Sequence, residues 1–141
     1  MALSADRELE MKDQGGVRKM LATASTAFYK GALVCIDPAT GLCLAAADTA
    51  NYLFMGIVKE AITTGAGGGE YVELWTKGVF KLPATSLEAA DGGKLLDITD
   101  DEAITDAGTN SVVVGRCIEV LSATSAWVEI HPGIPAGVTA S

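Results

Sequence analysis

Histidine is almost absent from the chain, which has one, His131, among 141 residues. Lysine and arginine are also scarce: ten of them face eighteen aspartates and glutamates, which gives a net charge of −8. A Ser-His-Asp or Cys-His site would need that histidine, and no G-x-S-x-G or similar signature accompanies it. Nucleic-acid binding needs clustered basic side chains, and the nearest thing to a cluster is Arg18 and Lys19. We therefore expect no enzyme activity, no direct nucleic-acid contact, and an acidic exterior suited to a basic partner.

Long apolar runs are also missing. The stretch from Leu53 to Val58 is far shorter than the roughly 20 residues that a membrane-spanning helix needs. Residues 1–8 contain neither the basic nor the apolar segment of a secretory signal peptide. We therefore expect no membrane association and a protein that is made and used in the cytoplasm, or assembled there into something larger.

The cysteines, Cys35, Cys43 and Cys117, are odd in number and show no C-x-x-C spacing. This pattern argues against a disulfide framework and indicates a reducing compartment. A structural zinc site needs four nitrogen or sulfur ligands close in space, which three cysteines and one histidine do not favour. We expect buried thiols that behave as small apolar side chains, with Cys35 and Cys43 flanking a turn and able to face each other across a hairpin.

The composition divides the chain into three parts. Residues 1–27 begin rich in charge, contain Gly15 and Gly16, and end in a run of small residues, so we interpret them as an extended N-terminal arm that binds a partner. A frayed terminus is the alternative. Residues 28–131 carry the punctuation of a β domain, and residues 132–141 form an irregular C-terminal tail.

Short apolar runs separated by turn residues fill the β domain. In Asp37 to Gly41, proline presets φ early in a turn and glycine accepts a positive φ at its end. About seven such strands predict an all-β fold, a small antiparallel β-sandwich or barrel of jelly-roll type. A helical turn or two is expected near Ser86 to Ala90. The predicted strands are 28–36, 42–46, 52–61, 71–82, 94–98, 112–121 and 126–131.

One pattern occurs twice. Phe54 to Ala61 is similar to Val113 to Val120, with Gly56 and Gly115 at matching positions. Each copy is followed by a loop and a similar strand, which contains Val-Glu and then an apolar residue. We interpret the two copies as related hairpins, with chance similarity between hairpins as the alternative.

Two loops invite comparison with ligand sites. Gly65 to Gly69 lacks the G-K-[S/T] ending of a phosphate-binding loop and leads from strand to strand, so we interpret it as a hairpin tip. The acidic residues from Asp97 to Glu102, with Asp106, do not have the spacing of an EF-hand. We interpret them as a solvated loop, with weak surface calcium binding as the alternative. No cofactor or metal ion is expected.

The two tryptophans, Trp75 and Trp127, are either core residues or anchors of an interface. The N-terminal arm and the C-terminal tail are the other candidates for contact with a partner. We therefore predict an interface that combines the tryptophans with residues of these terminal segments. Its predicted residues are Leu3, Leu9, Met11, Arg18, Lys19, Trp75, Trp127 and Ile134.

Read in order, the strand and turn segments resemble the small decoration, or cement, proteins of tailed-bacteriophage capsids. The resemblance covers about residues 28 to 131 and consists of glycines and apolar residues at strand positions. The residues that carry it are Tyr29 to Val34, Asp37 to Gly41, Phe54 to Val58, Gly69 to Phe80 and Val113 to Arg116.

The resemblance implies a structural protein that binds the outer surface of an icosahedral phage head and stabilises contacts between major capsid subunits. Its implied partners are the major capsid protein and further copies of itself, as a homodimer or homotrimer, and its implied location is the capsid exterior of the virion. The resemblance supplies no catalytic residue. The alternative is a small β-barrel that binds a ligand or serves a larger enzyme complex, which would require a concave apolar pocket.

Overall fold

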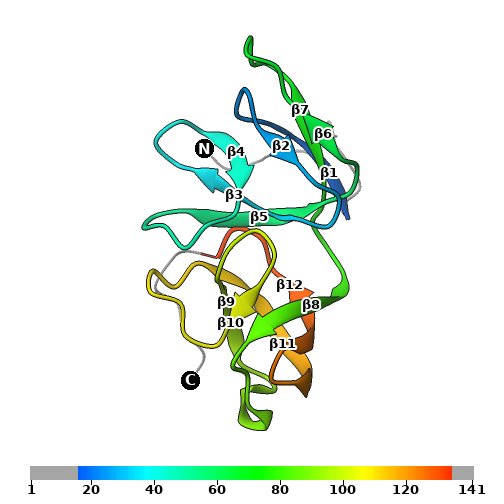
Figure 1. Cartoon of the computed structure of the whole chain (residues 1–141), viewed down its shortest axis with the longest axis vertical. Coiled ribbons are helices and arrows are strands. Elements are labelled where there is room, and N and C mark those ends of the chain that lie inside the picture. The colour runs from blue at the N-terminus through cyan, green and yellow to red at the C-terminus, as the bar shows by residue number, and fades with distance from the viewer. Residues whose placement is uncertain (1–15, 135–141) are drawn as a thin grey trace, which may run out of the picture.

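The computed structural model describes residues 16–134, and short β-strands dominate it (Figure 1). The predicted all-β, antiparallel fold with a barrel is confirmed. The only helical element among the described residues is one 3-10 turn, η1 (Ala89–Asp91), close to where a helical turn was expected. The strands are β1 (Val17–Leu21), β2 (Ala27–Phe28), β3 (Leu33–Asp37), β4 (Leu42–Ala45), β5 (Leu53–Val58), β6 (Ile62–Thr63), β7 (Tyr71–Trp75), β8 (Val79–Thr85), β9 (Leu95–Ile98), β10 (Ile104–Thr105), β11 (Val113–Ser122) and β12 (Ser125–Ile130).

The first half of the chain forms a curled sheet, which we call the N-terminal sheet, in the order β1-β7-β5-β3-β4. It curls until the residue after β1 meets β4, because Ala22 forms a parallel bridge with Cys43. The amide of Thr23 also donates to the carbonyl of Cys43 at 2.8 Å. Side chains from nearly every strand fill the interior, including Val34, Cys43, Val58, Val72 and Leu74.

The second half forms a closed barrel, which we call the C-terminal barrel, in the order β10-β8-β12-β11-β9. The pairing of β9 with β10 and the short parallel pairing of β10 with β8 close it. Along β8 and β12, buried and exposed residues alternate, as expected for strands with one face in a core. This alternation decides which side chains reach the outer surface.

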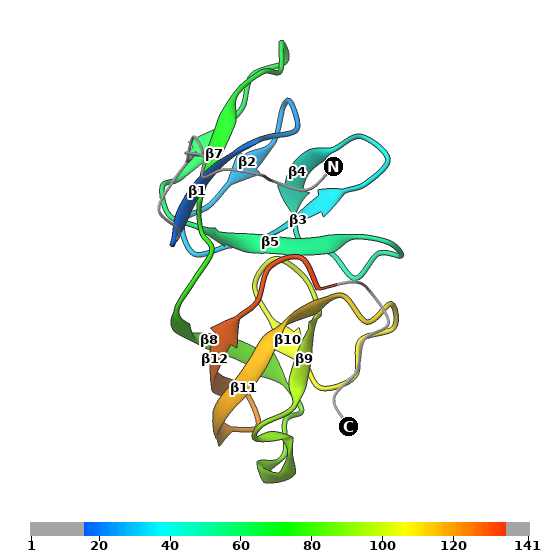
Figure 2. The ribbon, with the colours of Figure 1, turned by 180° about the vertical axis from the view of Figure 1, so that it is seen from behind.

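The N-terminal sheet lies against the C-terminal barrel, with β5 next to the barrel (Figures 1 and 2), and the two halves share one core. Leu33, Phe54 and Ile57 of the N-terminal sheet belong to the same buried cluster as the barrel interior. Hydrogen bonds cross the same boundary: the amide of Leu33 donates to the carbonyl of Asp101, and that of Gly133 to the carbonyl of Phe54, both at 2.8 Å. A shared core makes the two halves one folding unit.

The carboxylate of Asp48 adds a further link between the halves. Asp48 lies in the loop after β4, and its two oxygens accept the backbone amides of Thr109 and Asn110, each at 2.9 Å. The side-chain amide of Asn110 in turn donates to the Asp48 carbonyl at 2.8 Å. These bonds fix a loop of the N-terminal sheet against the loop that precedes β11.

The predicted boundary between an arm and the β domain at residue 27 needs correction. Val17–Leu21 is a strand of the N-terminal sheet and pairs with β7 along its whole length. Ala27 and Phe28 pair with β6, and the Phe28 ring is buried. The β domain therefore begins near residue 17, and residues 1–15 of the predicted arm lie outside the described residues, as do residues 135–141 of the predicted tail.

Several predicted strands are confirmed with changed limits. The predicted strand 28–36 is interrupted by a turn at residues 29–32, and the predicted strand 71–82 divides into β7 and β8. The predicted turn after β3 is confirmed: the amide of Gly41 donates to the carbonyl of Asp37 at 2.7 Å, and Gly41 has a φ of 73°. The two-residue strands β6 and β10 were not predicted.

The three cysteines are buried free thiols, as predicted. Cys35 and Cys43 do not face each other, however. In the β3–β4 pairing Cys35 lies opposite Leu44 and Cys43 opposite Ile36, so the two side chains point to opposite faces of the sheet. Burial raises the pKa of Cys35 to about 12 and that of Cys43 to about 11, which keeps both thiols protonated and unreactive near neutral pH.

The two similar segments both form antiparallel pairs, β5 with β7 and β11 with β12. Gly56 and Gly115 sit where a strand presses against its neighbour: a Cβ on Gly56 would lie 2.5 Å from the carbonyl oxygen of Trp75. A Cβ on Gly115 would overlap the carbonyl oxygen of Glu129. The repeated glycine therefore has the same steric role in both pairs, although the two registers differ.

The interpretation of residues 97–106 as a solvated loop needs correction at Asp97. This residue belongs to β9, its side chain is buried, and its Oδ2 accepts the amide of Gly108 at 3.0 Å. Burial raises the pKa of the Asp97 carboxyl, and the nearby charges of Asp48 and Asp106 act in the same direction. Asp100 forms an exposed turn, in which its Oδ1 accepts the amides of Glu102 and Ala103.

The buried carboxyl of Asp97 predicts a specific dependence of stability on pH. Because its pKa is higher in the folded protein than in the unfolded chain, the folded state holds the proton more tightly, and the free energy of unfolding falls as pH rises through the raised pKa.

Asp97→Asn keeps an acceptor for Gly108 without a charge. It should raise the melting temperature at pH 7 by a few degrees and change it little at pH 3. Melting curves from pH 3 to 8 test this, with Glu102→Gln, an exposed carboxyl, as control; a lower melting temperature of Asp97→Asn at pH 7 would contradict it.

Candidate binding surfaces

The outer wall of the C-terminal barrel presents a tryptophan between two opposite charges. On this wall β12 lies between β8 and β11, and Trp127 pairs with Lys81 on one side and Glu119 on the other. Residues directly opposite in antiparallel strands point to the same face, so these three side chains form one outward row. Trp127 is 38% exposed, and its aliphatic neighbours Ile118 and Val79 are 52% and 48% exposed. We call these five residues the Trp127 face.

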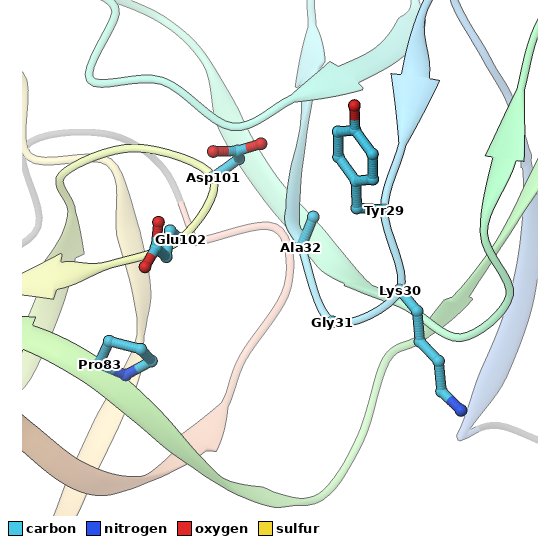
Figure 3. A pocket seen from close by; sticks show the side chains of 7 residues that line it. All are labelled: Tyr29, Lys30, Gly31, Ala32, Pro83, Asp101 and Glu102. Carbon is cyan, nitrogen blue, oxygen red and sulfur yellow. The ribbon is translucent and has the colours of Figure 1, made fainter.

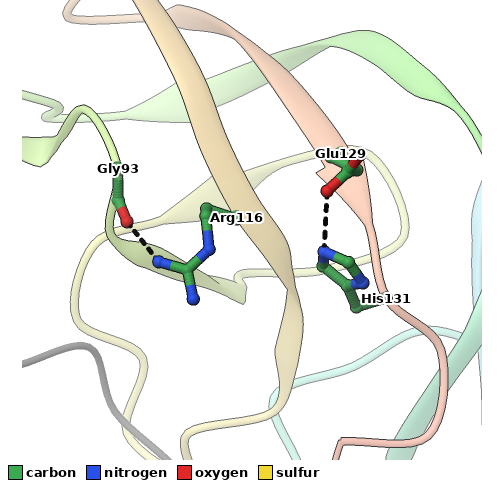
Figure 4. A network of polar contacts seen from close by, with 4 residues as sticks. All are labelled: Gly93, Arg116, Glu129 and His131. Carbon is green, nitrogen blue, oxygen red and sulfur yellow. Dashed lines mark hydrogen bonds and ion pairs between the residues drawn. The ribbon is translucent and has the colours of Figure 1, made fainter.

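Hydrogen bonds fix two side chains in the row next to Trp127, those of Arg116 and Glu129. The guanidinium of Arg116 donates to the carbonyl of Gly93 at 2.5 Å, which ties β11 to the turn before β9 (Figure 4). Glu129, one row from Trp127, binds the imidazole Nε2 of His131 at 3.0 Å along its own strand. His131 is thus a polar residue directly after the end of β12.

A β-bulge shapes the same face. The β11–β12 register shifts between Cys117 and Glu119, so Ile118 and Glu119 together lie opposite Trp127. Ile118 points outward by ordinary alternation with the buried Cys117, and the bulge places Glu119 on the same outer side. An apolar side chain therefore lies beside the tryptophan on a rigid sheet.

A groove lies where the two halves of the protein meet (Figure 3). Its volume is about 410 Å³, and the aromatic residue among those that line it is Tyr29, which lies in the turn before β3 and is 69% exposed. The carboxylates of Asp101 and Glu102 and the ring of Pro83 lie across from Tyr29, while Lys30 extends away from the carboxylates. We call this the Tyr29 groove; its lining residues are Tyr29, Lys30, Gly31, Ala32, Pro83, Asp101 and Glu102.

The backbone around Tyr29 is fixed by hydrogen bonds. The amide of Gly31 donates to the carbonyl of Val58 at 2.9 Å, and that of Ala32 donates to the carbonyl of Tyr29 at 3.0 Å. Gly31 adopts a φ of 86°, which closes this turn between β2 and β3. Tyr29 is therefore presented by an ordered turn, and its ring can bind without a large loss of backbone freedom.

A second groove, of about 460 Å³, lies beside the segment that joins β7 to β8 and the end of β12. Ile134, a predicted interface residue, lines it and is half-buried. Both grooves are open surface depressions lined in part by charged side chains. A ligand site of the kind expected for the alternative function is concave, mostly apolar and encloses its ligand, and neither groove has that form.

Trp75, a predicted interface residue, is engaged within the protein. Its ring packs against the shared core, and the Lys59 ammonium lies 5.3 Å from the ring centroid. The same ammonium binds Glu73 at 3.2 Å, so Lys59 covers the tryptophan and neutralises its neighbour. Of the two tryptophans, Trp127 is therefore the better candidate for contact with a partner.

The other predicted interface residues are distributed as follows. Arg18 and Lys19 are exposed on β1, and Lys19 lies opposite Glu73 in the β1–β7 pairing. This places them in the N-terminal sheet, away from the row that contains Trp127. Leu3, Leu9 and Met11 lie outside the described residues.

Sequence reasoning missed three exposed aromatic and aliphatic positions. Tyr71, 53% exposed, lies opposite Leu21 on the outer side of the N-terminal sheet. Tyr29 was included in a strand, and Ile118 in an apolar run. A signal for Tyr71 was present, because it alternates with the buried Val72 and Leu74 in the sequence. The same signal existed for Ile118, because it alternates with the buried Cys117 in β11.

The described residues contain no group of three or more histidine, cysteine, aspartate or glutamate side chains placed to hold a metal ion. Between residues 16 and 134 no helix is long and apolar enough to cross a membrane. No protein-family model and no curated protein matches the sequence of this chain.

Proposed function

We propose that the protein is a capsid decoration protein, which binds the outer surface of an icosahedral phage head and strengthens contacts between major capsid subunits. The resemblance described above suggests the partner. The observation that carries the proposal is that the resembling segments, which include most of β3, β5 and β7 and parts of β8 and β11, belong to one body with a shared core, and this body exposes the aromatic rings of Tyr29, Tyr71 and Trp127. A cement protein needs such rigid surfaces, because it must bridge subunits and not deform between them.

The Tyr29 groove is the surface that we assign to the shell. It combines an exposed aromatic ring with the carboxylates of Asp101 and Glu102, which together suit a lysine or arginine side chain of the partner. The net charge of −8 favours approach to a basic surface in the same way. Because the groove takes residues from both halves, a partner bound there contacts the whole protein as one unit.

Binding would stabilise the shell by linkage. A protein that binds the closed lattice, and whose composite site is lost when the lattice opens, shifts the equilibrium towards the closed form. Each copy needs only ordinary affinity, because many copies act on one shell. The effect therefore depends on occupancy and should rise as protein is added until the sites are full.

Shells prepared without this protein provide the direct test. We expect added protein to bind them and to raise the temperature at which they rupture, measured by calorimetry and by release of a packaged dye. If the shells never bind it, the capsid function is wrong. If they bind it and rupture at the same temperature as bare shells, the cementing role is wrong.

Tyr29→Ala tests the assignment of the groove. Truncation of an aromatic anchor costs about 2 kcal/mol or more, which is roughly a thirtyfold loss in affinity. We expect that loss in shell binding, with an unchanged melting temperature of the isolated protein because the side chain is exposed. Tyr71→Ala removes an exposed tyrosine from another surface and serves as the matched control. An equal loss with both variants would contradict the assignment.

A further inference from the structure

The charges of the Trp127 face are arranged so that the face is complementary to itself. Lys81, Trp127 and Glu119 form a row across three strands, with the positive charge on one side of the ring and the negative charge on the other. Only some rotations bring a second copy onto this row with opposite charges in contact.

A twofold axis parallel to β12, which lies above the outer face and passes between the Trp127 rings of the two copies, gives that arrangement. It places the ring against the same ring of the second copy, and exchanges the two sides of the row. Lys81 of each copy then faces Glu119 of the other, so two ion pairs form. An axis across the strands would instead place Lys81 against Lys81. The order of charges therefore selects one of the two simple ways to stack this face on itself.

We propose that the Trp127 face is the site at which two copies of the protein associate, with Trp127 stacked on Trp127 and Lys81 paired with Glu119 across the axis. Ile118, about half exposed, extends the apolar contact beside the ring, and Val79, in the row of Glu129, faces the aliphatic part of Arg116 in the second copy. In the next row Glu129 would approach its own copy, but its carboxylate is bound to His131 at 3.0 Å along its strand. This inference goes beyond the shell-binding function and stands whether or not that function holds.

The face is small, which limits the strength of the association. Three strands about 4.8 Å apart and four or five residues long cover roughly 200–300 Å², against about 800 Å² per partner for a standard interface. We therefore expect a weak, reversible dimer. Sedimentation velocity from about 1 μM to about 1 mM covers the range in which such an interface associates.

Charge reversal tests both the surface and the symmetry. Lys81→Glu places two glutamate pairs in contact and Glu119→Lys places two lysine pairs in contact, so each variant alone should associate at least about tenfold more weakly than the natural protein. An equimolar mixture of the two variants restores both ion pairs, because each copy supplies the charge that the other has lost. Association of the mixture should return to within about threefold of the natural value.

Three further observations complete the test. Trp127→Ala should abolish association while the variant remains folded, and Glu60→Lys, an exposed reversal outside the Trp127 face, should leave association unchanged. A natural protein that stays monomeric up to about 1 mM would overturn the proposal. So would a mixture that associates no better than its components, because the face would then meet a different partner or a different orientation of the same one. None of these measurements involves shells, so their failure is distinct from a failure of shell binding.

Discussion

We expect Gly115→Ala to destabilise the protein by about 3 kcal/mol or more, which is among the largest effects of any single added methyl group. The new Cβ would overlap the carbonyl oxygen of Glu129 and lie 2.9 Å from the Cα of Ile130. Both are backbone atoms of β12, so no side chain can turn aside to make room. The clash can be relieved only if β11 and β12 separate, which breaks the longest pairing in the barrel.

Thermal and urea denaturation measure this loss, and a drop in melting temperature of roughly 10 °C is expected for a protein of this size. Gly56→Ala should act in the same direction, because its Cβ would meet the backbone of Trp75 and Gly56 has a φ of 154°. Gly67→Ala is the matched control: nothing lies within 4 Å of its Cβ. If Gly115→Ala and Gly67→Ala unfold within 1 °C of each other, the proposed close approach of the strands is wrong.

For Gly56 and Gly115, the sequence predicted the pairing of their strands but not the reason for the glycine. The similarity of Phe54 to Ala61 and Val113 to Val120 pointed to two related hairpins, and both segments do pair antiparallel with the strands expected. The sequence could not show why glycine recurs, because the reason is the backbone of a strand 14 or more residues further on. Nor could it show that β10 would run parallel to β8 and close a barrel.

The alternation of buried and exposed residues along a strand also predicts which side chains reach the outer surface. In β12, Ala126, Val128 and Ile130 are buried, so Trp127 must point outward with Glu129. The same argument places Lys81 and Pro83 of β8 on the outer wall. The exposure of Trp127 was therefore predictable, whereas the exposure of Glu119 directly after the exposed Ile118 depends on a β-bulge.

The first strand illustrates a different limit. Val17–Leu21 has an irregular burial pattern and carries two adjacent basic residues, so it does not look like a strand in isolation. Its conformation comes from pairing with β7, where Lys19 lies opposite Glu73 and Leu21 opposite Tyr71. In the same way, the positions of Cys35 and Cys43 depend on where the turn closes: with Asp37 opposite Leu42, the two thiols differ by one residue in register and point to opposite faces.

Formation of a dimer should greatly increase the apparent affinity of the protein for shells. When two shell-binding sites are joined, the second binds at a high effective concentration, and apparent affinity can exceed that of one site by about 10²- to 10⁴-fold. If the Trp127 face joins two copies and each Tyr29 groove binds the shell, Lys81→Glu should lower apparent affinity for shells by about 100-fold or more, although the groove is unchanged. The loss arises because the variant binds as a monomer.

The charge-swapped mixture separates this effect from direct contact with the shell. An equimolar mixture of Lys81→Glu and Glu119→Lys should recover shell affinity and rupture temperature together, because it recovers the dimer and leaves both Tyr29 grooves intact. Quantitative binding to shells at increasing protein concentration gives the affinities, with Glu60→Lys as the control for a charge change elsewhere. If the mixture regains self-association but binds shells as weakly as either variant alone, then Lys81 and Glu119 contact the shell themselves. Cementing would then depend on the Trp127 face directly, and dimer formation would not contribute to it.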